Sequence, residues 1–400
     1  QLAEKANGNV FRTTVGAPNP NHINIIEGYS GNAINSDVMS STISGGGSLR
    51  QENIIGGNTN TVGNDNASNV ADLSGTGAHY AVIGGGYDNV NNGLASIITG
   101  YHCKIEKEAT HGTISGGSFQ RIVKGDYSTI GGGTQNEITQ SNAVIAGGNN
   151  NKAAGINSAI LGGSSNEASA QYATVLGGVG NKATANNAIV NGGSNNTASA
   201  GSAVIGGGSN NTASQSFATV AGGFQNTASQ SYAFIAGGRE NQANALYSSS
   251  SGRGAKAKFE GQKAHADGYF VAIGDAQFTD LILRMQSIDA TSKMIGINGV
   301  ATAPQIEAGS AWAFAYRIIA RSTTGDVKSW RAEGVIKRDA TGNASLVGSP
   351  VKTVIGETTG ASTWDVTILA GSATLNLNGI GASGTTINWV AKLETIEVIA

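Results

Sequence analysis

The sequence predicts an all-β chain in which a solenoid of short parallel strands is followed by an antiparallel β-sandwich. Three observations predict this fold class: a 15-residue repeat, a high glycine content, and a change to alternating polar and apolar residues towards the C-terminus. Glycine accounts for 60 of the 400 residues and proline for 4, which excludes collagen and proline-rich linkers. With 39% hydrophobic and 12% charged residues, the chain is expected to fold.

The pattern divides the chain into four expected segments. We expect an N-terminal attachment segment at residues 1–40, the solenoid at 41–247, a neck or cap at 248–274, and the sandwich at 275–400. Ile43 and Ile55 look like irregular first coils of the solenoid. No signal peptide and no membrane-spanning segment is expected from the apolar runs.

One apolar position recurs every 15 residues through most of the solenoid. Each repeat also holds a Gly pair, a polar pair, an Asn and an Ala, an order that fits two short strands joined by tight turns and not a helix. Each repeat is therefore expected to form one coil, with Gly allowing close backbone approach and the Asn adopting the left-handed conformation at a corner. The apolar column comprises Ile130, Ile145, Ile160, Val175, Val190, Ile205, Val220 and Ile235.

A second column consists of asparagines. If the coils stack at about 4.8 Å, these amides form a ladder whose neighbours can hydrogen-bond along the column. Coils this thin bury little apolar surface against the entropy of ordering them, so we expect several identical chains to pack their rolls around a common axis. The ladder comprises Asn151, Asn166, Asn181, Asn196, Asn211, Asn226 and Asn241.

The repeat is expected to end after Ile235, because the next position in the column is Ser250. Basic residues then gather in the segment predicted as the neck. We interpret them as a polar cap that seals the solenoid, with a basic collar for an anionic glycan as the alternative. They are Arg253, Lys256, Lys258 and Lys263.

From about Gly274 the residues alternate along longer strands. Residues 312–318 place aromatic and apolar side chains on one face, residues 330–336 repeat this pattern, and the intervening residues 324–326 are typical of a hairpin turn. A sandwich of jelly-roll character is expected. Its further strands are predicted at residues 351–354, 364–369, 373–377 and 386–393.

Catalytic chemistry is not expected, and the chain is predicted not to be an enzyme. No His follows His265, so the C-terminal domain cannot hold a Ser-His-Asp triad by itself. The regular coils from 141 to 236 hold one carboxylate, Glu167, where a glycosidase needs two. A carboxylate pair in the C-terminal domain is the alternative left open, among Asp326, Glu333, Asp339, Glu357 and Asp365.

Cofactors, metals and nucleic acid are not expected either. None of the Gly-rich stretches is followed by the Lys-Ser or Lys-Thr of a phosphate loop. His79, His102, His111 and Cys103 fall at different phases of the repeat, which argues against a shared metal. The net charge of −2 gives no field that favours nucleic acid.

The repeat at residues 158–168, Ser-Ala-Ile-Leu-Gly-Gly-Ser-Ser-Asn-Glu-Ala, resembles the head repeats of trimeric autotransporter adhesins. It looks still more like the Gly-Gly-rich version found in bacteriophage tail fibres, over roughly residues 40–270. Residues 252–257 and 265–268 resemble the neck of these fibres. The chain resembles a C-terminal domain common in phage tail fibre and appendage proteins at residues 312–321, 332–338 and 387–391. This resemblance implies a trimeric left-handed parallel β-roll followed by an antiparallel β-sandwich.

The resemblance also implies a function. It implies a tail fibre, extracellular on the virion and homotrimeric, which joins other tail or baseplate proteins and presents its distal domain to host polysaccharide or lipopolysaccharide. Since loops on a rigid scaffold carry recognition, we expect contacts from residues 322–328 and 356–362. Alternatives are a bacterial trimeric adhesin, a tailspike depolymerase, and a distal domain that only trimerises the chain. The expected contact residues are Thr324, Asp326, Lys328, Thr358 and Ser362.

Overall fold

The computed structural model describes residues 80–399 throughout. Ahead of them it describes only the strands β1 (Leu2–Glu4), β2 (Val10–Val15), β3 (Ile23–Glu27), β4 (Ala33–Ile34), β5 (Thr42–Ser44) and β6 (Ile54–Ile55). The chain divides into two compact units, Gln1–Gly207 and Gly208–Ala400. Within the described residues the one helical segment is the 3₁₀ turn η1 (Thr359–Ala361), so the predicted all-β class is confirmed. No helix in this part of the chain is long and apolar enough to cross a bilayer.

The described N-terminal strands change from antiparallel to parallel pairing. β1, β2 and β3 pair antiparallel, whereas β3 pairs parallel with β5. Ile43 is in register with Ile83 on the first ladder of the roll, and Ile55 is in register with Asn91 on the second. Ile43 and Ile55 therefore belong to two strands of one coil. The rest of the predicted attachment segment lies outside the described residues.

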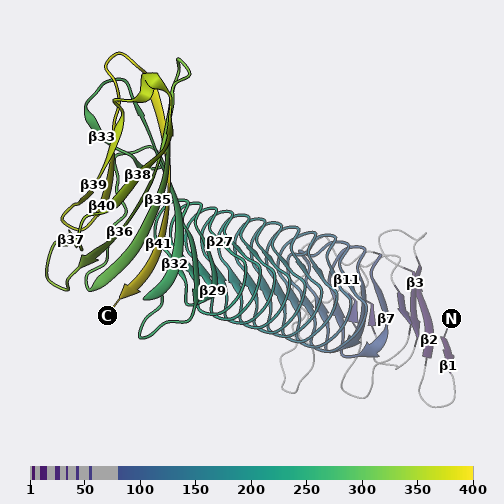
Figure 1. The fold of residues 1–400 in the computed structure, drawn as a ribbon. Coiled ribbons are helices and arrows are strands. Elements are labelled where there is room, and N and C mark those ends of the chain that lie inside the picture. The colour runs from purple at the N-terminus through teal and green to yellow at the C-terminus, as the bar shows by residue number, and fades with distance from the viewer. Residues whose placement is uncertain are drawn as a thin grey trace. The chain divides into compact units, whose positions relative to one another are not determined.

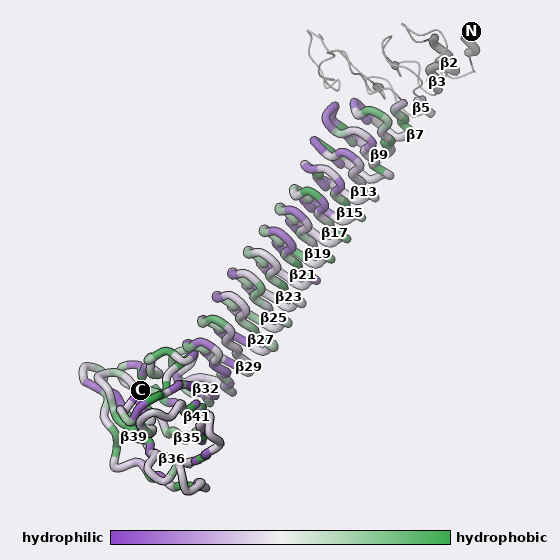
Figure 2. Tube along the Cα trace, turned by 90° about the horizontal axis from the view of Figure 1, so that it is seen from above, coloured by the Kyte–Doolittle hydropathy of each residue, from purple (hydrophilic) through white to green (hydrophobic). Residues whose placement is uncertain are grey.

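Each coil of the first unit contributes two short strands, and these form two parallel ladders (Figures 1 and 2). The register advances by 15 residues between most neighbouring coils, as from Ile145 to Ile160, which confirms the parallel solenoid. The first ladder contains β7 (Val82–Tyr87), β9 (Ile97–Tyr101), β11 (Thr113–Ile114), β13 (Thr129–Ile130), β15 (Val144–Ile145), β17 (Ala159–Ile160), β19 (Thr174–Val175), β21 (Ile189–Val190) and β23 (Val204–Ile205). The second contains β8 (Val90–Asn91), β10 (Lys104–Ile105), β12 (Arg121–Ile122), β14 (Glu137–Ile138), β16 (Lys152–Ala153), β18 (Glu167–Ala168), β20 (Lys182–Ala183) and β22 (Thr197–Ala198).

The second unit begins with coils of the same kind. Ser250 aligns with Ile235 and is buried, and its hydroxyl donates a hydrogen bond of 2.6 Å to the carbonyl of Gln242. The parallel pairing therefore continues through much of the segment predicted as a neck, as far as Asp267. The strands are β25 (Thr219–Val220), β27 (Phe234–Ile235), β29 (Ser249–Arg253) and β31 (Lys263–Asp267) on one ladder, and β24 (Thr212–Ala213), β26 (Thr227–Ala228), β28 (Gln242–Ala243) and β30 (Lys256–Ala257) on the other.

The interior of the coils is narrow and well filled. All eight Ile and Val residues of the apolar column have no exposed surface. A typical coil adds two buried alanines, such as Ala173 and Ala183 beside Val175. The seven ladder asparagines are also buried.

The ladder amides bond to backbone and not to one another, which differs from the prediction. The Oδ1 atom of Asn166 accepts from the backbone N–H of Asn181 at 2.9 Å. Its Nδ2 group donates to the carbonyls of Gly162 and Gly178 at 3.0 and 2.9 Å. Each amide thus ties the Gly pair of its own coil to the next coil.

The prediction that the ladder asparagine adopts the left-handed conformation is wrong. The residue before it does so, as at Asn150 with φ of 54° and Ser165 with φ of 56°. The ladder residue must instead direct its amide inwards, and the turn is made one position earlier.

A two-sheet domain follows the last coils. The larger sheet has the order β32 (Ala276–Ser287), β41 (Ile387–Ile399), β35 (Ser310–Ser322), β36 (Val327–Arg338) and β38 (Val351–Glu357), all antiparallel. The smaller contains β33 (Ser292–Met294), β40 (Leu375–Ile380) and β39 (Asp365–Ala370). Two short strands join the larger sheet, β34 (Gly296–Ile297) and β37 (Ala344–Leu346).

One apolar cluster includes buried residues of both sheets of this domain, among them all four tryptophans. The antiparallel C-terminal region is therefore confirmed. The predicted hairpin is present too, since Arg321 pairs with Val327 across the turn.

Candidate functional site

The loops predicted to contact a receptor lie at one end of the larger sheet. β31 pairs with β32 as far as Asp280, and β32 continues to Ser287, where it pairs with Ile387. At about 3.3 Å per residue, this end lies roughly 23 Å beyond the last coil. The hairpin turn at 322–326 and the loop after β38 meet there.

The structure brings the five predicted residues together but gives them different roles. Asp326 accepts a hydrogen bond of 2.8 Å from the hydroxyl of Thr358, which joins the two loops. Thr324, Thr358 and Ser362 are exposed. Lys328 is buried, and its ammonium group binds Glu357 at 2.6 Å and the carbonyl of Ser362 at 3.1 Å. Lys328 therefore holds the loops in place.

The outward face of the larger sheet carries a row of three cations. Arg317 on β35 stands directly opposite Arg331 on β36, and directly opposite Lys392 on β41. Like charges in directly opposed positions destabilise a sheet. The sequence has thus placed positive charge where the fold alone would disfavour it.

Acidic neighbours compensate two of the three cations. Lys392 binds Glu394 at 2.6 Å and Asp280 at 3.2 Å. The hydrogen bonds that Lys392 donates to these two carboxylates raise its pKa, and the bond to Glu394 lowers the pKa of that carboxyl. Arg331 pairs with Glu333 on its own strand. In the part of the chain that the structure describes, Arg317 forms no ion pair within 4 Å, although its charge also lowers the pKa of Glu394.

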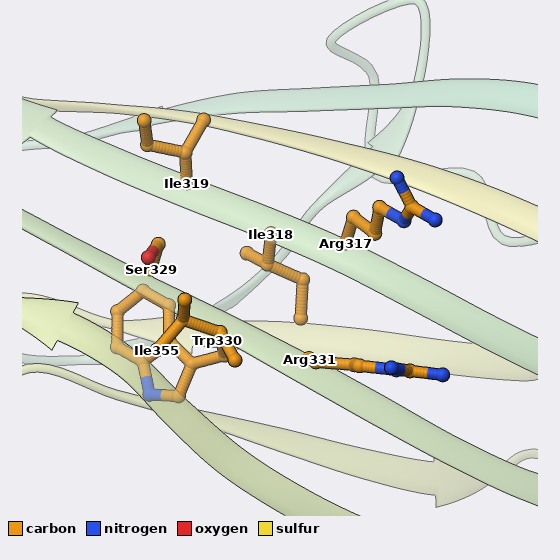
Figure 3. A pocket seen from close by; sticks show the side chains of 7 residues that line it. All are labelled: Arg317, Ile318, Ile319, Ser329, Trp330, Arg331 and Ile355. Carbon is orange, nitrogen blue, oxygen red and sulfur yellow. The ribbon is translucent and has the colours of Figure 1, made fainter.

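A shallow depression of about 360 Å³ lies between the two arginines (Figure 3). Both guanidinium groups lie at one side of it, and Ile319 and Ser329 lie at the other. Ile319 and Ile355 are 50% and 64% exposed, so the depression combines positive charge with accessible apolar surface. Ile355 immediately precedes the loop that carries Thr358.

The five carboxylates among which a glycosidase pair was left open each bind a different partner. Asp326 bonds to Thr358, and the other four form ion pairs with four different basic residues. Those pairs are Arg331–Glu333, Lys337–Asp339, Lys328–Glu357 and Lys352–Asp365.

The histidines and the cysteine of the first coils have other partners. His102 contacts Asp88 at 2.6 Å and stacks on Phe119, and His111 stacks on Tyr127. Cys103 is buried, which raises the pKa of its thiol. His79 lies outside the described residues. Within those residues no three His, Cys, Asp or Glu side chains are grouped to hold a metal ion.

Comparisons with known proteins give weak structural similarities. No family model matches the chain, and no curated protein matches it. One similar solved structure is the tailspike protein gp49 of Acinetobacter baumannii bacteriophage Fri1, a capsular polysaccharide depolymerase, with 10% identity, a TM-score of 0.19, and coverage of 91% of this chain and 81% of that one. Another is the Acinetobacter phage vB_ApiP_P1 tailspike protein, with 8% identity, a TM-score of 0.24, and coverage of 94% and 81%.

The prediction that the chain is not an enzyme is corrected by this comparison, because the Fri1 tailspike is a depolymerase. Catalytic residues were excluded only for the regular coils at 141–236 and for the C-terminal domain. The segment at 248–274 lies outside both and contains Ser, His and Asp residues.

Proposed function

We propose that this chain is a bacteriophage receptor-binding protein of the virion tail whose C-terminal domain binds an acidic polysaccharide of the host surface. The observation that carries the proposal is the cation row of Lys392, Arg317 and Arg331, in which Arg317 forms no direct ion pair with a carboxylate among the described residues. The parallel roll, and the resemblance of its repeats to those of phage fibres, support the placement on a tail.

The depression suits an acidic sugar. A guanidinium group binds a carboxylate through two parallel hydrogen bonds, which suits a uronic acid. Ile319 and Ile355 offer apolar surface to the C–H face of the ring. The loop that follows Ile355 carries the exposed Thr358 and Ser362, and Thr358 bonds to Asp326 of the hairpin loop that carries Thr324, so a chain of sugars that leaves the depression on this side meets both loops.

Arg317→Ala is expected to weaken polysaccharide binding about tenfold or more, because it removes the one guanidinium of the row that forms no direct ion pair among the described residues. Biolayer interferometry on immobilised acidic capsular polysaccharide, and on the same polysaccharide with its carboxylates reduced to alcohols, measures this. The wild-type protein should lose affinity for the reduced form. Lys337→Ala is the matched control, since Lys337 lies on the same outward face but pairs with Asp339. Equal binding of both polysaccharides, or equal effects of the two substitutions, would contradict the proposal.

Incubating the protein with the acidic polysaccharide in solution separates binding from cleavage. Release of oligosaccharides into solution supports the tailspike depolymerase alternative, whereas intact polysaccharide retained on the protein supports a binding fibre. Retention that depends on Arg317 also distinguishes a receptor tip from a domain that only trimerises the chain.

The proposed function includes a homotrimer, and the surface of the roll in the first unit supports self-association. Next to the buried column, Val144 on β15 and the residues directly after β17 and β19, Leu161 and Leu176, are 39%, 52% and 43% exposed. The second ladder instead carries charged pairs such as Lys182 and Glu167 at 3.9 Å. A face that repeats apolar residues from coil to coil marks a surface that a protein covers.

Light scattering coupled to size exclusion is expected to give three times the mass of the chain. Leu161→Lys combined with Leu176→Lys should shift the protein to the monomer, because it places charge on the apolar face. Thr197→Lys, on the charged ladder, is the matched control and should leave the mass unchanged. A wild-type monomer would contradict the assembly.

A further inference from the structure

The last two coils of the second unit carry a serine, a histidine and an aspartate in contact with one another. Ser251 on β29 is in register with His265 on the next coil, in β31. The Oγ atom of Ser251 lies 3.0 Å from Nδ1 of His265, and Nε2 of His265 lies 3.3 Å from Oδ1 of Asp267. We propose that this array is an ester-hydrolysing site that removes small acyl groups from sugar hydroxyls.

The parallel ladder explains why these side chains meet. Side chains alternate along β31, so that His265 and Asp267 both point outwards while Ala264 and Ala266 point inwards. Gly252 follows Ser251 with φ of 89°, and a Cβ atom there would overlap the carbonyl oxygen of Ala266 on the next coil and lie 3.0 Å from the ring of His265. The glycine leaves room for the imidazole beside the serine.

The array has the chemistry of an activated nucleophile. With its proton on Nε2, His265 donates to Asp267 and accepts the Ser251 hydroxyl proton at Nδ1. The ring nitrogens are used in the reverse of the more familiar order, but each nitrogen has its partner at hydrogen-bonding distance. Asp267 is 97% exposed, so it acts as a positioning residue with a modest effect.

A depression of about 200 Å³ adjoins the array. It is lined by Phe234 and Phe278, which are 44% and 43% exposed and come from β27 and β32 on either side of the two coils. Lys263, which points outwards from β31 two residues before His265, also lines it, directly opposite Asp280, whose carboxylate binds Lys392. The two rings fit a small apolar acyl group such as acetyl, and the ammonium group supplies positive charge for the oxyanion that forms on its carbonyl.

The reaction balances with water as the only co-reactant. The Ser251 oxygen attacks the ester carbonyl while its proton passes to His265, and the sugar oxygen leaves with that proton, which gives an acyl-serine. Water then attacks the acyl-serine, again with His265 as base, and releases the carboxylic acid and the free serine. The nature of the sugar substrate rests on the proposed function, whereas the ester chemistry does not.

Two assays test the site on the full chain: hydrolysis of 4-nitrophenyl acetate, and release of acetate from an O-acetylated acidic polysaccharide. Ser251→Ala and His265→Gln are expected to lower kcat at least 100-fold, and Asp267→Asn to lower kcat several-fold at unchanged KM. A fluorophosphonate probe should add one mass tag, on Ser251. Ser231→Ala, a serine of the same unit outside the site, should keep the wild-type rate.

The outcomes also separate this site from the polysaccharide site. Ser251→Ala should bind polysaccharide as the wild type does, and Arg317→Ala should keep its rate on 4-nitrophenyl acetate. A wild-type chain that neither hydrolyses the ester nor takes the probe would overturn the inference. So would a Ser251→Ala protein with the wild-type rate, because the array would then only tie two coils together.

Discussion

Replacing Gly163 with alanine is expected to lower the free energy of unfolding by about 4 kcal/mol. Gly163 has φ of 85°, which costs a residue with a Cβ about 1–2 kcal/mol. The added Cβ would also overlap the carbonyl oxygen of Gly178 on the next coil. That oxygen accepts from Ser164 and Asn166, so moving it away breaks hydrogen bonds between coils, each worth about 1 kcal/mol. Chemical denaturation followed by circular dichroism measures the change.

Gly162 is the matched control for this prediction. It is the other member of the same Gly pair, its φ is not positive, and a Cβ there would meet no atom within 4 Å. Gly162→Ala should therefore change stability by less than about 1 kcal/mol. If the two alanine variants unfold at the same denaturant concentration, close approach of the coils is not what the second glycine provides.

The period of the repeat predicted the position of each buried residue but not the partners of its polar atoms. A spacing of 15 fixes which residues align from coil to coil. It does not say whether the amide of Asn166 meets the next amide or the next backbone, since both lie about one coil away. Ser250 likewise suggested an end to the roll, because it stands where the column predicts an apolar residue. A hydroxyl that bonds to the backbone can occupy the same place.

In the C-terminal domain, local pairing could be predicted and distant pairing could not. The hairpin turn at 322–326 fixes the register of β35 and β36, so the opposition of Arg317 and Arg331 follows from the sequence once the turn is located. Lys392 joins this row only because β41 inserts between β32 and β35, which no local pattern shows. The burial of Lys328 depends on the same nonlocal packing.

The Ser251 array shows how coil length can hide a site. Ser251 and His265 are 14 residues apart, one fewer than the usual period, so alignment at 15 does not bring them together. The shorter coil was visible in the sequence only as a loss of the repeat.

Asn151→Ala is expected to lower the free energy of unfolding by about 3–4 kcal/mol. The buried Asn151 amide donates to the carbonyls of Gly147 and Gly163 at 3.1 and 3.0 Å and accepts from the N–H of Asn166 at 2.9 Å. Alanine leaves the buried N–H of Asn166 without this acceptor, at a cost of about 1–3 kcal/mol, and the lost donors add to it. The midpoint and slope of urea unfolding measure the loss.

Asn149→Ala tests whether the effect comes from the inward amide. Asn149 lies in the same coil, two residues earlier, and its side chain is exposed. Its replacement should cost less than about 0.5 kcal/mol, the range usual for surface positions. Because Asn151 bonds to the Gly pairs of two coils, its loss should also lower the denaturant slope if the coils separate there before the rest unfolds. Similar losses at both positions would mean that the amide ladder does not hold the coils together, and that the apolar column does so.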